Sequence, residues 1–205
     1  GIRDQPRSRG SEMCIRDSIK RFLLFRMAKV SYNYTRAKSL KRRQKEYNQM
    51  TIRRANENDI PRLLELLEQV LQVHADIRPD IFIPGTTKYT NEELAQMIKD
   101  DTKPIYVAAD ENDNCLGYAF CQLQEQPFSN NMVPFTSLFI DDLCVDASTR
   151  GQHIGEKLFV HVKEEAKRLG CYEVTLNVWA GNTSAEKFYE KMGLKTKEQQ
   201  MEYIL

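Results

Sequence analysis

The segment from Leu143 to Leu158 (LCVDASTRGQHIGEKL) constrains the fold of this chain more than any other. Its pattern predicts a strand over 135–145, a glycine-containing turn and a helix that ends at Gly170, and a further strand is predicted over 172–178. The apolar face of the predicted helix comprises Ile154, Leu158, Val162, Ala166 and Leu169. A strand, helix and strand in this order form a right-handed crossover with parallel strands in nearly all proteins. We therefore expect a parallel strand pair covered by a helix.

Hydrophobic spacing and capping signals predict the other elements. A strand over 51–55 precedes a helix that is capped by Asn58, and Thr90 with Glu93 forms a capping box for a shorter helix. The remaining predicted elements are a hairpin of strands 104–110 and 114–123, a short helix that Thr183 and Glu186 cap, and one or two strands within 194–205. This order is typical of a mixed α/β sandwich, with a twisted mixed sheet of about six or seven strands and about four flanking helices.

Charge divides the chain into two chemically different parts. The net charge is +1, but residues 1–49 hold 14 Lys or Arg and 4 Asp or Glu, a net of +10, so the other 156 residues carry −9. An acidic body binds polyanions poorly and attracts cationic, amine-bearing ligands. Nucleic acid is therefore not an expected partner.

Residues 1–49 lack the sustained periodicity of a folded domain. They could be a basic arm, an Arg-rich targeting peptide or foreign sequence. We favour foreign sequence, because Ser11–Ser18 (SEMCIRDS) resembles a peptide that recurs in translated sequencing-adapter read-through. Met50 is then the expected native start, and 50–205 the expected domain.

Composition argues against a membrane span and a metal centre. No window approaches the roughly 20 apolar residues that a membrane span requires, so we expect a soluble, cytoplasmic protein. The five cysteines include no C-x-x-C pair, and the three histidines form no H-E-x-x-H helix. Neither a metal nor a disulfide scaffold is expected.

The turn over 150–155 has the features of an anion site. A strand that runs through glycines into a helix leaves successive N–H groups pointing outward at the positive end of the helix dipole. The turn lacks the G-x-x-x-x-G-K-[ST] spacing of a P-loop and the G-x-G-x-x-G spacing of a dinucleotide fold. A phosphate group that belongs neither to a nucleoside triphosphate nor to NAD is the expected ligand.

A second segment, 182–193 (NTSAEKFYEKMG), follows one strand later. The two segments together resemble the GCN5-related N-acetyltransferase superfamily: Arg150 and Gly155 match its [Q/R]-x-x-G-x-[G/A] motif, and 182–193 matches its N-x-x-A-x-x-F-Y-x-x-x-G helix. The resemblance covers about 51–205. His153 stands where the family has a glycine, and we expect it to keep a usable N–H without a positive φ, with its ring turned away from the phosphates or in contact with them.

The resemblance implies acetyl-CoA as co-substrate and assigns roles to named residues. The main chain of Leu143, Cys144 and Val145 would pair with the pantetheine arm, with one N–H near the thioester oxygen. Asn182 would bind near the pantetheine, and Tyr189 would protonate the departing thiolate. The implied diphosphate site comprises Arg150, Gly151, Gln152, His153, Ile154 and Gly155.

The acceptor side is less well defined by sequence. Asp141 or Asp142 could take the proton from an ammonium substrate, and we slightly prefer Asp142. Strand alternation would send the two side chains to opposite faces, so that without a bulge at most one reaches the site. The candidate acceptor-pocket residues are His74, Arg78, Asp80 and Phe82.

These expectations define an acetyl-CoA-dependent N-acetyltransferase. It would act by direct attack of a primary amine of a small molecule, protein or peptide in a ternary complex, as a monomer or homodimer. A catalytically silent acyl-CoA-binding regulatory module is the alternative. It would keep the phosphate turn but would not need Tyr189.

Overall fold

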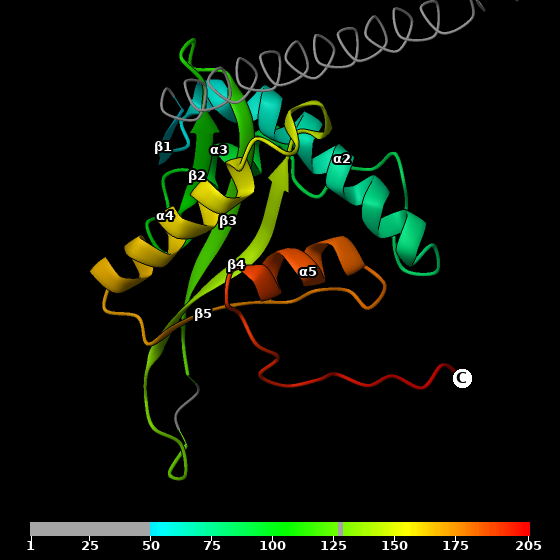
Figure 1. Cartoon of the computed structure of the whole chain (residues 1–205), viewed down its shortest axis with the longest axis vertical. Helices are drawn as coiled ribbons and strands as arrows, with labels where there is room; N and C mark the ends of the chain where they lie inside the picture. Colours follow the sequence, from blue (N-terminus) through cyan, green and yellow to red (C-terminus); the bar gives the residue numbers. More distant parts are fainter. Residues whose placement is uncertain (1–49, 127–128) are drawn as a thin grey trace, which may run out of the picture. The chain divides into compact units, whose positions relative to one another are not determined.

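The computed structural model of the protein describes residues 50–126 and 129–205 (Figure 1), so the predictions for 1–49 lie outside the described residues. No helix in these ranges is long and apolar enough to cross a membrane. The elements in chain order are β1 (Thr51–Arg54), η1 (Glu57–Asp59), α2 (Ile60–Ile77), α3 (Asn91–Met97), β2 (Ile105–Ala109), β3 (Cys115–Glu125), β4 (Thr136–Val145), η2 (Ala147–Thr149), α4 (Ile154–Arg168), β5 (Glu173–Leu176) and α5 (Thr183–Lys191).

The strands form one mixed sheet in the order β1-β2-β3-β4-β5. Neighbours pair antiparallel from β1 to β4, whereas β4 and β5 are parallel and joined through α4. This confirms the mixed α/β fold, the predicted hairpin and the parallel crossover. The sheet has five strands over the described residues, slightly fewer than expected.

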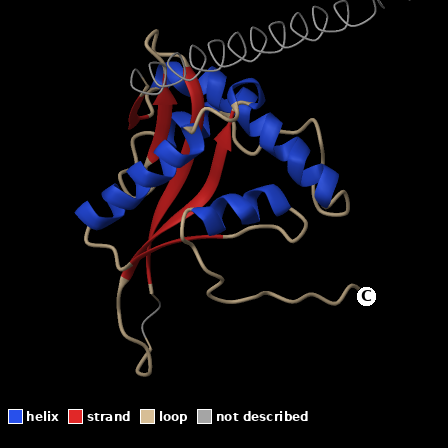
Figure 2. Cartoon of the chain, in the orientation of Figure 1, coloured by secondary structure: helices blue, strands red, loops and turns tan. Residues whose placement is uncertain are grey.

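A hydrophobic core lies on each face of the sheet. On one face α4 packs Ile154, Leu158 and Val162 against the strands, and Phe188 and Tyr189 of α5 border the same core. On the other face α2 and α3 contribute Leu63, Leu66, Leu67 and Leu94. Figure 2 shows helices on both sides of the strands. Leu169, the last residue of the predicted apolar face of α4, is exposed.

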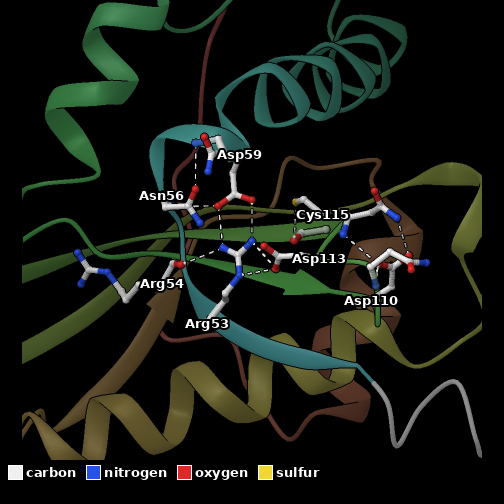
Figure 3. A network of polar contacts seen from close by, with 11 residues as sticks. Arg53, Arg54, Asn56, Asp59, Asp110, Asp113 and Cys115 are labelled. Atoms are coloured by element: carbon white, nitrogen blue, oxygen red, sulfur yellow. Dashed lines mark hydrogen bonds and ion pairs between the residues drawn. The ribbon is translucent and has the colours of Figure 1, made fainter.

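A network of polar contacts fixes the start of α2 against the sheet (Figure 3). Arg53 of β1 donates to both carboxylate oxygens of Asp59, at 2.7 and 2.9 Å, and also to Asp113 in the β2–β3 turn. Asn56 and Asp59 form a reciprocal capping box over η1. The helical region therefore begins with a short 3₁₀ turn capped by Asn56, two residues earlier than the predicted cap at Asn58.

Two predictions near the end of the chain are wrong. The cap of α5 is Asn182, whose Oδ1 accepts from the N–H of Ala185 at 3.2 Å, and Thr183 is already the first helical residue. An amide oxygen one residue earlier reaches the first free N–H groups, so the Thr183 and Glu186 box does not form. Residues 194–205 form no strand. Within the described residues, β5 is the edge strand of the sheet and pairs with β4 alone.

Candidate active site

Strand β4 changes character halfway along its length. It pairs with β5 only between Ser137–Ile140 and Glu173–Leu176, and Figure 1 shows the second half of β4 rising away from β5. From 142 to 145 the strand pairs with β3 alone, so within the described residues its other edge has no strand partner. The N–H and C=O groups of an unpaired edge can accept an extended ligand as an added strand.

A bulge marks the point of this change. The β3 partner of Ile140 is Cys121 and that of Asp142 is Phe120, so Asp141 has no partner. A bulge places two residues opposite one and interrupts side-chain alternation. The alternation that would send the two aspartates to opposite faces applied only without a bulge, so this bulge allows both side chains to reach one site.

Both carboxylates instead meet residues of the core that α2 and α3 cover. Asp142 accepts a hydrogen bond from the hydroxyl of Tyr118 at 2.9 Å, and Asp141 accepts one from the hydroxyl of Tyr89 at 3.3 Å. Tyr118 lies in that core and Tyr89 packs against it. Two adjacent carboxylates thus border one site.

The environment of Asp142 suits a general base. Its carboxyl group is surrounded by protein even though the residue as a whole is only half-buried, and this burial raises its pKa to about 6, against the lowering effects of the Tyr118 hydrogen bond and the Lys88 charge. A base with a pKa near the operating pH is ionised yet still accepts a proton readily. Burial, with the nearby Asp142 charge, also raises the pKa of Tyr118 well above its usual range, so this phenol stays a donor.

Asp141 is more exposed than Asp142 and forms an ion pair with a lysine. Lys88 Nζ lies 2.7 Å from Asp141 Oδ2 and 5.3 Å from the centre of the Tyr89 ring. Burial alone would lower the pKa of Lys88, but the hydrogen bond and charge of Asp141 outweigh it and raise the pKa. The sequence analysis missed Lys88, Tyr89 and Tyr118. The capping box at Thr90, which fixes the residues just before α3, was the available signal for the first two.

The turn after β4 is anchored from α2. Asp146 caps η2 by accepting from the N–H of Ser148 at 2.8 Å, and it forms an ion pair with Arg62. Gln69, also on α2, accepts from the N–H of Ala147 at 3.1 Å. The side chains of α2 thus hold the first half of this turn, at residues 146 and 147. They form none of these contacts with its glycine-containing second half.

The second half of the turn is shaped by two left-handed residues, Gly151 with φ 79° and His153 with φ 62°. The expectation that His153 needs no positive φ is therefore wrong: it is the N-cap residue of α4 rather than a residue of its first turn. Its Nδ1 lies 3.0 Å from Glu156 Oε2, so the ring is held by the helix. The side chain of His153 makes no capping hydrogen bond to the first turn of α4.

The two glycines of this turn have different surroundings. A Cβ added at Gly151 would meet nothing within 4 Å, whereas one at Gly155 would approach Phe188 at 3.4 Å and Val145 at 3.6 Å. Glycine at 155 therefore keeps the start of α4 close to both β4 and α5. Arg150 is exposed, Gln152 half-buried and Ile154 buried in the core, and the Arg150 Nε lies 3.5 Å from the carbonyl oxygen of Val145.

Tyr189 of α5 is half-buried beside Phe188 and Phe159, with ring centres 5.0 and 6.3 Å away. Burial first, and then the negative charge of Asp142, raise its pKa. The hydroxyl therefore stays protonated near neutral pH and lies within the electrostatic influence of Asp142. Asn182, at the start of the same helix, uses its side-chain oxygen as the cap.

The four candidate acceptor residues form a separate group with Trp179. The Phe82 ring lies 5.1 Å from His74 and 5.2 Å from Trp179, while Arg78 lies over Trp179 at 5.8 Å. Arg78 pairs with Asp80 at 2.7 Å and also with Glu202 at 2.7 Å. Burial and the charge of Lys88 lower the pKa of His74, which links this group to the carboxylate site.

No cluster of three or more His, Cys, Asp or Glu side chains that could hold a metal occurs in 50–126 or 129–205. The cysteines at 115, 121, 144 and 171 are free thiols. Burial raises the pKa of Cys144 to about 12, which leaves it a poor nucleophile and agrees with a role for its main chain alone.

Comparison with known proteins identifies the family. The model of the Acetyltransferase (GNAT) family matches residues 67–194. A glucosamine 6-phosphate N-acetyltransferase of Arabidopsis thaliana is 37% identical over 62 residues, which cover 30% of this chain and 40% of that protein. A peptidyl-lysine N-acetyltransferase of Salmonella typhimurium is 31% identical over 105 residues, which cover 50% of this chain and 59% of that protein.

The chain thus spans about two fifths to three fifths of the length of these two relatives. Among solved structures, a mutant of a Bacillus halodurans protein superimposes with a TM-score of 0.72 at 27% identity and covers 76% of this chain and 99% of that one. The family match extends from within α2 to the residue after Gly193 and so includes β3, β4, the turn that follows β4, α4 and α5. The chain belongs to the GNAT family of acetyltransferases.

Proposed function

We propose that this protein is an acetyl-CoA-dependent N-acetyltransferase that modifies a primary amine. The observation that carries the proposal is the second half of β4, which has an open edge, begins at a bulge bearing two carboxylates and leads into the N-terminus of α4. An extended thioester with a diphosphate at one end matches this arrangement: its amides can pair with the strand edge and its phosphates can meet the turn.

The residues that would hold acetyl-CoA follow from that match. The main chain of 143–145 would pair with the pantetheine amides, and the N–H groups of 150–155 would bind the diphosphate. The Asn182 oxygen already caps α5, so only its amide nitrogen is proposed to reach the pantetheine. Acetyl-CoA supplies the acetyl group as an activated thioester.

The side chains around the bulge would manage the protons. Asp142 would take the proton of the acceptor ammonium, because its raised pKa of about 6 suits a base near neutral pH. Asp141, more exposed, would bind and orient that ammonium. Tyr189 would give its proton to the sulfur as the C–S bond breaks, and its raised pKa keeps the hydroxyl protonated until then.

The acceptor that we propose is a cationic primary amine, carried by a small molecule or by a lysine side chain. The two carboxylates at the bulge support a cation, and the Phe82 and Trp179 rings offer an apolar surface in the neighbouring group. Arg78 is held by two carboxylates, which favours a neutral or cationic acceptor body over a strongly anionic one.

Calorimetry with coenzyme A, followed by a thiol-release assay, tests this function. We expect saturable binding of coenzyme A and acetyl-CoA turnover that depends on an amine drawn from polyamines, aminoglycosides, amino sugars and short lysine peptides. No heat of binding would overturn the placement of the site. Binding without turnover on any amine would instead favour an acyl-CoA-binding regulatory module.

A further inference from the structure

The side chain of Lys88 lies across the bulge of β4. Its Nζ is 2.7 Å from Asp141 Oδ2, and the negative charges of both Asp141 and Asp142 act on it. The chain therefore places one of its own primary amines beside the two carboxylates proposed to receive the acceptor. The side chain is 47% exposed, so it is not locked into a core.

Other lysines in the described chain have partners of a different kind. Lys99 pairs with Glu57 of η1 at 2.8 Å and is 69% exposed, and Lys167 pairs with Glu164 one turn earlier on α4 at 2.9 Å. Both pairs lie on the surface, and neither includes a residue of β4. Chemical reactivity alone would favour these more exposed amines over Lys88, which makes them internal controls.

We propose that Lys88 is itself an acetyl acceptor of this site. The inference rests on the proposed function. The ammonium of Lys88 first gives a proton to Asp142, and the free amine attacks the carbonyl carbon of the bound acetyl-CoA thioester. A C–N bond forms, the C–S bond breaks, and the sulfur leaves as a thiolate that takes the proton of Tyr189. The attacking nitrogen then gives its second proton to the Tyr189 phenolate, which restores the hydroxyl, and Asp142 releases the first proton to solvent. The products are acetyl-lysine and coenzyme A, with net release of one proton and no change of oxidation state.

Acetylation of Lys88 would change the site that carries it. The modification removes the positive charge and with it the ion pair to Asp141. Asp141 then becomes available to an external ammonium, which competes with Lys88 in the unmodified protein. Self-acetylation would therefore convert a carboxylate occupied by the chain's own amine into one open to the acceptor.

The test is mass spectrometry of the full chain after incubation with isotope-labelled acetyl-CoA. We expect label at Lys88 to accumulate at least about tenfold faster than at Lys99 or Lys167, because a bound amine reacts at a high effective concentration. The rate constant should not change with protein concentration. Label at Lys88 no faster than at Lys99, or a rate constant that rises with protein concentration, would overturn the inference.

Variants separate this inference from the proposed function. Tyr189→Phe and Asp142→Asn should slow labelling of Lys88 while leaving Lys99 labelling unchanged, and equal labelling of Lys88 in these variants would count against the site. Lys88→Arg keeps a cation beside Asp141 without the nucleophilic amine, so the site-specific label should disappear.

If coenzyme A binds and an external amine is acetylated while Lys88 stays unlabelled, this inference alone fails. Absence of coenzyme A binding would remove the proposed function as well.

Discussion

The two sides of the candidate site are built from different parts of the chain. The proposed acetyl-CoA side is almost continuous in sequence and consists mainly of the open half of β4, the turn with Gly151 and His153, and the start of α4, with Asn182 and Tyr189 added from α5. Most of its contacts with a ligand would come from the main chain. The acceptor side gathers side chains from α2, the loop before α3, β3, the bulge, the β5–α5 connection and residue 202.

This difference explains why the two sides have different chemical properties. Main-chain N–H groups do not titrate, so a site made of them changes little with pH. The side chains around the bulge have shifted pKa values because they lie close together and are partly buried. We therefore expect changes on the acceptor side to alter turnover and its pH dependence, and changes in the turn to alter the binding of coenzyme A.

The largest effect is expected at the carboxylates. Asp142→Asn keeps an acceptor for the Tyr118 hydroxyl but removes the base, and should lower kcat by about 10² to 10⁴. Asp141→Asn should instead raise KM for the amine by about tenfold with a smaller change in kcat, because it removes a charge-assisted hydrogen bond. Steady-state kinetics with a cationic acceptor checks both, and the reverse pattern would exchange the two roles.

Tyr189→Phe should have the next largest effect. It removes one hydroxyl from a half-buried ring and leaves the contacts with Phe159 and Phe188 in place. Turnover should fall by about tenfold or more, while calorimetry shows coenzyme A binding unchanged. Unchanged turnover would make Tyr189 a packing residue.

Part of this architecture could be predicted from sequence because it depends on local signals. The Thr90 and Glu93 capping box, the apolar face of α4 and the parallel crossover each follow from spacing within one or two elements, and all three are confirmed except that Leu169 lies outside the buried face. The cap of α5 and the expected strands after 194 were wrong. A cap depends on which of two neighbouring polar side chains reaches the free N–H groups, and a strand requires a partner that its own sequence does not specify.

The candidate site shows the same division. The turn over 150–155 was predicted from its glycines, although the left-handed φ of His153 was not, because the residue precedes α4 rather than belonging to it. The bulge at Asp141 depends on the register of β3 against β4, which strand alternation cannot reveal. Lys88 comes 53 residues before Asp141, so their contact exists only through the tertiary fold.

The pH dependence should differ between the two sides. Asp142 has its pKa raised to about 6 and acts as a base only when ionised, so kcat/KM should fall about tenfold for each pH unit below 6. Coenzyme A binding should change much less over the same range. The free energy of unfolding should change with pH in the opposite direction to activity. A carboxyl whose pKa is raised by folding stabilises the folded protein most when it is protonated, and this stabilisation is lost as pH rises through about 6. A pH–rate profile measured alongside pH-dependent calorimetry checks the contrast, and an acid limb that persists in Asp142→Asn would assign it to another group.

The smallest effect is expected from glycines with matched geometry. Gly151 and Gly170 have φ of 79° and 73°, and a Cβ at either would meet nothing within 4 Å, so alanine introduces the same backbone strain without a clash. Each substitution should lower the free energy of unfolding by about 1 to 2 kcal/mol. Only Gly151→Ala should also weaken coenzyme A binding, by about fivefold, because only Gly151 helps to aim N–H groups of the turn. Chemical denaturation and calorimetry on both variants separate strain from recognition: equal losses of binding would mean that the turn acts through stability alone, and the main-chain side of the site would have to lie elsewhere.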